Sequence, residues 1–184
     1  MINTDELKIV NYCHPKCEPF MNILRIPKDE AFALAYKMSA ENPETTAFYR
    51  FADFENYYPR RIKQDAELYS QFKTLGGNPQ ESHPLSFVLQ GSDYLYDWFG
   101  KGTVYEMFLK NIPAEYISFT YGDSGAVFNK TGFISVITKD KLLESIRSFN
   151  GTLDEYMKEM TKKHYYIEVQ LWNDEYIKNF RSNI

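Results

Sequence analysis

Consecutive strand-like segments, most of them with no helix in between, constrain the fold of this chain more than any other feature. Each is rich in the aromatic and β-branched residues that favour strands. They lie in the middle of the chain, whereas helical patterns lie early and late. This order favours the α+β class, with a mostly antiparallel or mixed sheet, over a doubly wound parallel fold. The segments are "HPLSFVLQ", "GTVYEMFLKNIP", "EYISFTYGDSG" and "TGFISVITK", with a short helix "SDYLYDWFG" between the first two.

Apolar residues at helical spacing predict the remaining helices. One of these helices stops at Gly76 and Gly77, a strong C-terminal signal, and another begins at a capping box made by Thr152 and Glu155. We expect one domain over residues 1–184, with an irregular opening and with helices packed on a central sheet, split or continuous. The helices are expected at residues 27–41, 61–75, 140–149, from 152 to about 163, and from about 173.

Two further strands are expected, and each carries a charge at its centre. They are "TTAFYRFADF" with Arg50 and "YYIEVQLW" with Glu168. Because side chains alternate across a strand, Glu168 lies opposite the apolar row and shares its face with polar and aromatic residues. A charge in a sheet is costly unless it is paired or faces a wet cleft. Arg50 and Glu168 are therefore either paired or solvated structural residues, or they face one ligand-binding groove.

Composition and charge exclude several classes of protein. Apolar residues make up 43% and charged residues 25%, which is the ordinary globular range. The net charge of −4 argues against nucleic acid as the main partner. The opening residues lack the pattern of a secretion signal, and no apolar segment approaches the roughly 20 residues of a membrane span. We therefore expect a cytoplasmic protein with no membrane partner. Aromatic residues, at 17%, suit either a cleft with stacking walls or an ordinary core.

Cys13 and Cys17 flank His14 in "NYCHPKCEPF". Structural zinc usually has four ligands in paired clusters, and the chain has no second cysteine pair. A reducing cytoplasm also argues against a disulfide. We therefore expect no metal site, but a turn at His14 and Pro15 between two extended segments.

Four other polar residues have a structural interpretation. Arg60 and Arg61 could bind phosphate at a helix start, although a solvated helix end is expected. His83 is of the type that serves as a general base, but no nucleophile motif accompanies it. Asp123 in "YGDSG" is typical of a turn.

Three short motifs, taken in order, resemble the ADP-ribosyltransferase fold of the Arg-Ser-Glu type. "FYRF" supplies the arginine, Arg50, and "HPLSFVLQGSDYLYDWF" resembles the serine strand and its following helix, with Ser86. "YYIEVQLW" supplies the late glutamate, Glu168. The similarity covers roughly residues 45–172. Only the first serine of the Ser-Thr-Ser motif is present, and Glu168 precedes Gln170, whereas transferring members usually carry Glu or Gln two residues before the glutamate.

The resemblance implies NAD as a substrate and gives each residue a role. Glu168 would be catalytic, because a fixed carboxylate stabilises the positive charge that develops on the ribose as nicotinamide leaves. Arg50 would hold the pyrophosphate or its ribose. Ser86 would brace Glu168 or the nicotinamide ribose. Tyr94 and Tyr96 would stack on the nicotinamide ring. Taken alone, Ser86 is more typical of a strand hydroxyl that binds the backbone, and Tyr94 and Tyr96 of the packing of a helix on the core.

Two functions are therefore expected. The first is an NAD-dependent ADP-ribosyltransferase that modifies a macromolecule, or an NAD glycohydrolase. The alternative is a non-catalytic, protein-binding or immunity-type module with an aromatic sheet face. The enzyme needs a concave pocket in which Arg50 and Glu168 converge with room for a ligand, whereas the binding module needs only an exposed patch.

Overall fold

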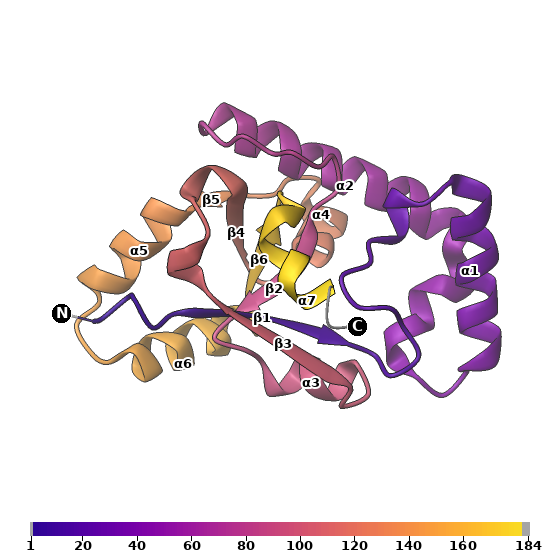
Figure 1. Ribbon diagram of the computed structural model, residues 1–184, viewed down its shortest axis with the longest axis horizontal. Helices are drawn as coiled ribbons and strands as arrows, with labels where there is room; N and C mark the ends of the chain where they lie inside the picture. Colours follow the sequence, from indigo (N-terminus) through magenta and orange to yellow (C-terminus); the bar gives the residue numbers. More distant parts are fainter. Residues whose placement is uncertain (1, 182–184) are drawn as a thin grey trace.

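A six-stranded sheet lies at the centre of the computed structural model, which describes residues 2–181 (Figure 1). Its strands are β1 (Lys8–Cys13), β2 (Leu85–Leu89), β3 (Thr103–Phe108), β4 (Ile117–Tyr121), β5 (Ile137–Thr138) and β6 (Ile167–Leu171). They follow the order β3-β1-β2-β6-β4-β5, and every neighbouring pair is antiparallel. The sheet and its helices confirm the expected α+β class.

Helices pack around the sheet. They are α1 (Lys28–Glu41), α2 (Phe54–Thr74), α3 (Asp93–Trp98), α4 (Ser124–Thr131), α5 (Lys139–Ser148), α6 (Leu153–His164) and α7 (Lys178–Arg181), with 3-10 helices η1 (Ile23–Arg25), η2 (Thr46–Asp53), η3 (Leu109–Asn111), η4 (Ala114–Tyr116) and η5 (Asp174–Ile177). In Figure 1, α1 and α2 lie at the right and top of the view, and α5 and α6 at the left. The capping box of Thr152 and Glu155 at the start of α6 is confirmed. None of the helices within residues 2–181 combines the length and apolarity needed to cross a membrane.

The two faces of the sheet carry different side chains. Ile167, Val169 and Leu171 of β6 lie in the main hydrophobic core, together with residues of α5 and α6. On the other face, α2 packs against Trp172, and Glu168 belongs to this second row. The predicted alternation of β6 is therefore confirmed, and both rows are buried.

Hydrogen bonds satisfy the polar groups of the second face. Ser118 Oγ donates to Gln170 Oε1 over 2.9 Å, and Gln170 Nε2 donates to Thr120 Oγ1 over 3.2 Å. Trp172 Nε1 donates to Ser118 Oγ over 2.8 Å. Since an unpaired buried polar group is costly, this network explains how β4 and β6 carry polar side chains in the interior.

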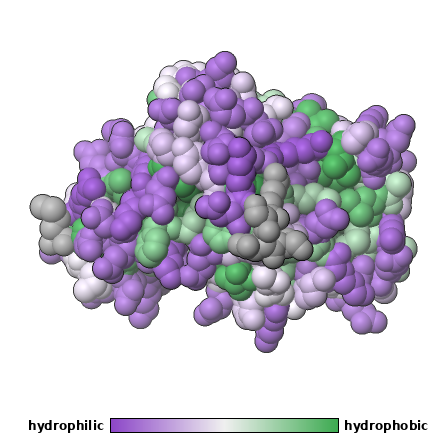
Figure 2. Space-filling model, in the orientation of Figure 1, coloured by the Kyte–Doolittle hydropathy of each residue, from purple (hydrophilic) through white to green (hydrophobic). Residues whose placement is uncertain are grey.

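The strand predicted for residues 45–54 is wrong, because this segment forms the 3-10 helix η2. Phe48, Phe51 and Phe54 recur every three residues, which is the period of a 3-10 helix. Their ring centroids lie 5.7 and 5.6 Å apart in succession. Phe51 and Phe54 pack with α1 and α2 in a separate cluster, and Figure 2 shows one of the small hydrophobic surface patches where α1 and α2 meet.

Three other segments differ from expectation. The opening residues form β1, which pairs with both β2 and β3 although Lys8 and Asn11 interrupt its apolar pattern. The strand predicted in "TGFISVITK" is shorter than expected and comprises only Ile137–Thr138. The start of this segment instead belongs to α4, a helix that was not predicted and that ends at Gly132, with a φ of 70°. Helix α2 begins at Phe54 and contains Pro59, a residue that normally indicates a helix start or break.

Candidate functional site

Ser86 and Glu168 lie on the same face of the sheet. In the ladder of β2 and β6, Ser86 is opposite Gln170 and Val88 is opposite Glu168, and opposite residues of antiparallel strands point to the same side. Ser86 is exposed although β2 is an interior strand, so solvent reaches this face. Glu168 is only 8% exposed.

Arg50 reaches this face from η2, and not from a strand as the sequence predicted. Its Nη2 atom lies 3.6 Å from Asp123 Oδ2, and its Nε donates to the Tyr49 hydroxyl over 2.7 Å. The guanidinium lies 5.4 and 5.9 Å from the ring centroids of Tyr49 and Tyr57. Two tyrosines and one carboxylate therefore hold Arg50 beside the start of α4.

Ser124, the first residue of α4, binds both oxygens of Glu168. Its backbone N–H donates to Oε2 over 2.7 Å, and its Oγ lies 3.0 Å from Oε1. The N-terminus of a helix favours such a contact, because its first N–H groups lack partners within the helix. Asp123 pairs with Arg50 and Ser124 binds Glu168, so this dipeptide joins the two predicted residues.

Gln64 of α2 holds Ser124 from the other side. Its amide satisfies its neighbours when the oxygen faces Ser124 Oγ at 2.8 Å, Gly125 N at 3.2 Å and Arg61 Nη1 at 2.9 Å. In the opposite orientation the amide nitrogen would face two donors. Arg61 is thereby connected to Ser124 through one amide group.

Burial raises the pKa of Glu168, and the neighbouring Asp123 raises it further. The hydrogen bonds from Ser124 and the charge of Arg61 act in the opposite direction without reversing the shift. The hydroxyl of Ser124 has one proton and faces two acceptors, Gln64 Oε1 and Glu168 Oε1. When Ser124 Oγ donates its proton to Gln64 Oε1, a protonated Glu168 can donate to Ser124 Oγ. The raised pKa of Glu168 favours this protonated form.

Asp65 and His83 extend the polar cluster along α2. Asp65 is fully buried, and its Oδ2 lies 2.9 Å from His83 Nδ1. Its Oδ1 lies 3.3 Å from Arg61 Nε. His83, which no nucleophile motif accompanies in the sequence, is thus paired with a buried carboxylate. Arg61 is mostly buried inside α2 and is not a solvated helix end, whereas Arg60 is exposed.

Four aromatic rings form a continuous row on the surface. Tyr49 contacts Trp98, Trp98 contacts Tyr94, and Tyr94 contacts Tyr165, with centroid distances of 5.7, 5.9 and 6.0 Å. We call these four residues the aromatic row. Tyr49, Tyr94 and Tyr165 are 54%, 51% and 74% exposed. Because Tyr49 also binds Arg50, the row begins beside the charged cluster.

Two tyrosines near the row have further contacts. Tyr96 is 36% exposed and lies 6.0 Å from Tyr12 of β1, measured between ring centroids. Tyr165 has a φ of 67° and a ψ of −46°, which is a strained backbone conformation for a residue other than glycine. Strain of this kind is found mostly at functional sites.

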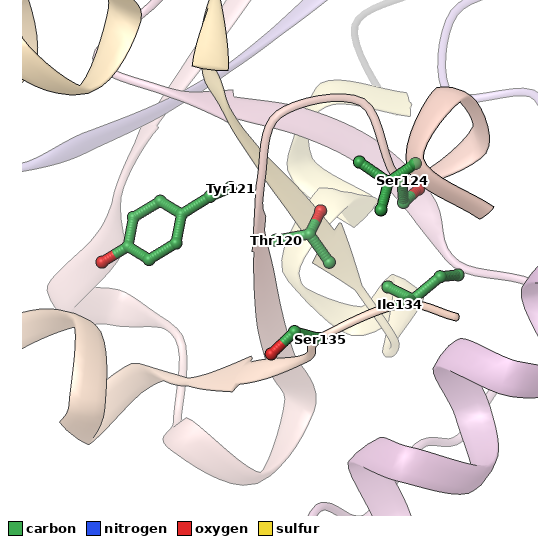
Figure 3. A pocket seen from close by; sticks show the side chains of 6 residues that line it. Thr120, Tyr121, Ser124, Ile134 and Ser135 are labelled. Carbon is green, nitrogen blue, oxygen red and sulfur yellow. The ribbon is translucent and has the colours of Figure 1, made fainter. Parts of the chain in front are cut away.

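A small cavity lies beside Ser124 (Figure 3). Its volume is about 80 Å³, which suits a few water molecules and not a nicotinamide ring. Figure 3 shows Thr120 between Tyr121 on one side and Ser124 and Ile134 on the other. Neither Arg50 nor Glu168 lines this cavity, so it is not the concave pocket that the enzyme requires.

Cys13, His14 and Cys17 form the turn expected from the sequence, in which Cys17 N–H donates to the His14 carbonyl over 2.9 Å. Burial raises the pKa of the Cys17 thiol to about 11, with Cys13 adding to the shift. Over residues 2–181, no group of three or more His, Cys, Asp and Glu side chains is placed to hold a metal ion.

Sequence reasoning missed Ser124, Gln64 and Asp65. A signal for the first was present, because Asp123 after Gly122 is a good helix N-cap, and Asp123 Oδ1 does accept from Ala126 N over 2.9 Å. Gln64 and Asp65 had no local signal. Their partners Ser124 and His83 are 60 and 18 residues away.

No family model, curated protein or solved structure matches this chain. The candidate site therefore rests on its own geometry.

Proposed function

We propose that this protein binds NAD on the sheet face that carries Ser86 and Glu168, and that it acts as an ADP-ribosyltransferase or NAD glycohydrolase. One observation carries the proposal. Arg50 and Glu168, which are far apart in the sequence, meet the neighbouring residues Asp123 and Ser124 at the start of α4. A cation suited to a pyrophosphate and a carboxylate suited to a developing ribosyl cation thus lie on two sides of one turn.

Arg50 is the residue that would bind the pyrophosphate. Its pair with Asp123 is long, at 3.6 Å, and both side chains are about one-third exposed, at 31% and 35%. Exposed pairs of this kind contribute little, roughly 0–1 kcal/mol. A phosphate can therefore replace Asp123 as the partner of Arg50 at low cost and gain charge-assisted hydrogen bonds.

Ser86, Tyr94 and Tyr96 would complete the binding surface. The exposed hydroxyl of Ser86 can bind a ribose hydroxyl beside Gln170 and Glu168. Tyr94 and Tyr96 are exposed enough to stack on the nicotinamide ring. A pyridinium ring carries positive charge, which favours the faces of tyrosine and tryptophan rings.

Glu168 would stabilise the ribosyl cation as nicotinamide leaves, and water or a macromolecular nucleophile would complete the reaction. Its two oxygens are bound to Ser124, and its pKa is raised. The carboxylate must therefore be ionised and reached by the substrate before cleavage. Binding and cleavage are separable steps in this proposal.

Release of nicotinamide from NAD tests the cleavage step. We expect wild-type protein to release nicotinamide and Glu168→Gln to release none while keeping NAD binding. Glu159→Gln is the matched control, because Glu159 is an exposed carboxylate on α6. If wild type binds NAD and releases no nicotinamide, the protein binds NAD without cleaving it.

A second candidate is a protein-binding module that uses the aromatic row. The exposure of three tyrosines and the strained backbone of Tyr165 favour this alternative, since tyrosine, tryptophan and arginine dominate protein interfaces. The two candidates differ in their ligand. Failure to bind NAD at millimolar concentration would leave the aromatic row as a surface for a protein partner.

A further inference from the structure

β3 is the outermost strand of the sheet and has an open edge. All six of its residues pair with β1, from Lys8 opposite Phe108 to Cys13 opposite Thr103. β3 stands at one end of the strand order, and Figure 1 shows it beside β1 at the front of the sheet. An open strand edge is a template for pairing with another chain.

The alternation of hydrogen-bonded pairs between β1 and β3 shows which backbone groups of β3 are free. Leu109 N–H donates to the Leu7 carbonyl over 2.8 Å, immediately beyond the β1–β3 ladder. Since hydrogen-bonded and non-hydrogen-bonded pairs alternate in antiparallel strands, the N–H and C=O groups of Val104 and Glu106 point away from β1. No other hydrogen bond within the described residues uses these four groups.

Two apolar side chains of β3 are exposed beside this edge. Val104 and Phe108 are 41% and 40% exposed, and they lie on the same face of β3 as Glu106. Natural edge strands are normally short or protected by charges. Here the only charge between Val104 and Phe108 is Glu106, and Lys8 of β1 binds it over 2.7 Å. The ammonium groups of Lys8 and Lys110 also lie 5.9 and 5.2 Å from the centroid of the Phe108 ring.

We propose that β3 pairs with β3 of a second copy of this chain, antiparallel, so that the two sheets become one. A two-fold axis requires residues from the same face to oppose one another. The register centred on Glu106 places Val104 of each copy opposite Phe108 of the other copy, so the pair forms on both sides of the axis. The register centred on Tyr105 would instead place Val104 opposite Glu106. The first register places both exposed apolar side chains in cross-strand contact, which stabilises an antiparallel pair.

Charges at the centre of this register are balanced. The two copies of Glu106 face each other, which alone would be unfavourable. Each glutamate is paired with its own Lys8 at 2.7 Å on the neighbouring strand. Each Lys8 lies on the far side of its own Glu106 from the axis, so the two cations neutralise the two facing anions. The two central Glu106 residues exchange both backbone hydrogen bonds.

Sedimentation velocity of the full-length chain over a wide range of concentration tests the dimer. We expect a reversible dimer whose dissociation constant rises at least about tenfold in Val104→Lys, which places charges beside Phe108 of the second copy. Val104 is exposed, so the variant should unfold at the wild-type temperature. Leu75→Lys is the matched control, because Leu75 is 49% exposed at the far end of α2, and it should dimerise like wild type.

Cross-linking tests the register independently. A cysteine in place of Glu106 lies opposite its own copy, so a short bis-maleimide should join two Glu106→Cys chains. Glu115→Cys, at an exposed position outside β3, should stay uncross-linked, as should wild type with its two native cysteines. A chain that remains monomeric, or a dimer that neither Val104→Lys weakens nor Glu106→Cys cross-links, overturns the proposal. NAD binding can fail without affecting either result.

Discussion

Ser124 binds both oxygens of Glu168, through its backbone N–H at 2.7 Å and its hydroxyl at 3.0 Å. This relationship answers why a carboxylate lies in the middle of an apolar strand. Glu168 accepts a hydrogen bond from the first N–H group of α4, although it lies on β6, 44 residues later in the chain. The same contact fixes the position of the residue that the proposed reaction requires.

Ser124→Ala should destabilise the fold by about 1–3 kcal/mol, because it keeps the backbone N–H but leaves Glu168 and Gln64 without their shared hydroxyl. Urea denaturation measures the change in the free energy of unfolding. Ser148→Ala is the control, since Ser148 is exposed and its hydroxyl donates to the Ser145 carbonyl one turn earlier in α5. It should stay within about 0.5 kcal/mol of wild type. Equal effects of the two substitutions would contradict the claim that the buried hydroxyl of Ser124 stabilises the fold through Glu168 and Gln64.

Glu168 should make the fold less stable as the pH rises. Its pKa is raised above 4.5 in the folded chain, by burial first and by Asp123 second. The stability contributed by the protonated carboxyl is therefore complete below pH 4.5. It is lost as the pH rises through the raised pKa, by about 1.4 kcal/mol for each unit of elevation.

Glu168→Gln cannot lose a proton, and its amide can donate to Ser124 Oγ as a protonated carboxyl does. From pH 4.5 to neutrality, its free energy of unfolding should therefore rise relative to that of wild type. Urea denaturation at a series of pH values measures this difference. A constant difference between Glu168→Gln and wild type would contradict the raised pKa.

His83→Ala should destabilise the fold by about 1–3 kcal/mol, because it leaves one oxygen of the fully buried Asp65 without its donor. The effect should be smaller in an Asp65→Asn background, where no carboxylate remains for His83 to pair with. Chemical denaturation of the two single variants and the double variant gives the interaction energy directly. Additive effects would show that the two side chains are energetically independent.

Cys17 should react slowly with iodoacetamide at neutral pH, because burial, and then Cys13, raises its pKa to about 11. Thiolates and not thiols are the nucleophiles. The rate of alkylation in the folded protein should keep increasing up to about pH 11. The urea-unfolded protein is the reference and should level off near the ordinary thiol pKa. Equal pH profiles in the two states would contradict the shift.

Local signals in the sequence predicted much of the fold. The capping box of Thr152 and Glu155 and the alternation of β6 each depend on residues close together in the chain, and both are confirmed. The segment with Arg50 was misread, because its aromatic composition suits a strand while its spacing of three suits a 3-10 helix.

The candidate site was only partly predictable. Arg50 and Glu168 were singled out because an isolated charge in an aromatic segment needs a partner. Their partners could not be inferred, since Asp123 and Ser124 looked like an ordinary turn. Their contacts form only when α4 packs against β6 and η2. Long-range pairing of this kind has no signature in one sequence.

Calorimetric titration with NAD tests the central claim most directly. We expect saturable binding by wild type and by the control Arg60→Ala, whose arginine is exposed on α2 and binds the Asn56 carbonyl. Arg50→Ala should weaken binding by at least about tenfold, because it removes the only side chain proposed to bind the pyrophosphate. Absence of binding by wild type at millimolar NAD, or equal binding by Arg50→Ala and wild type, would contradict the claim.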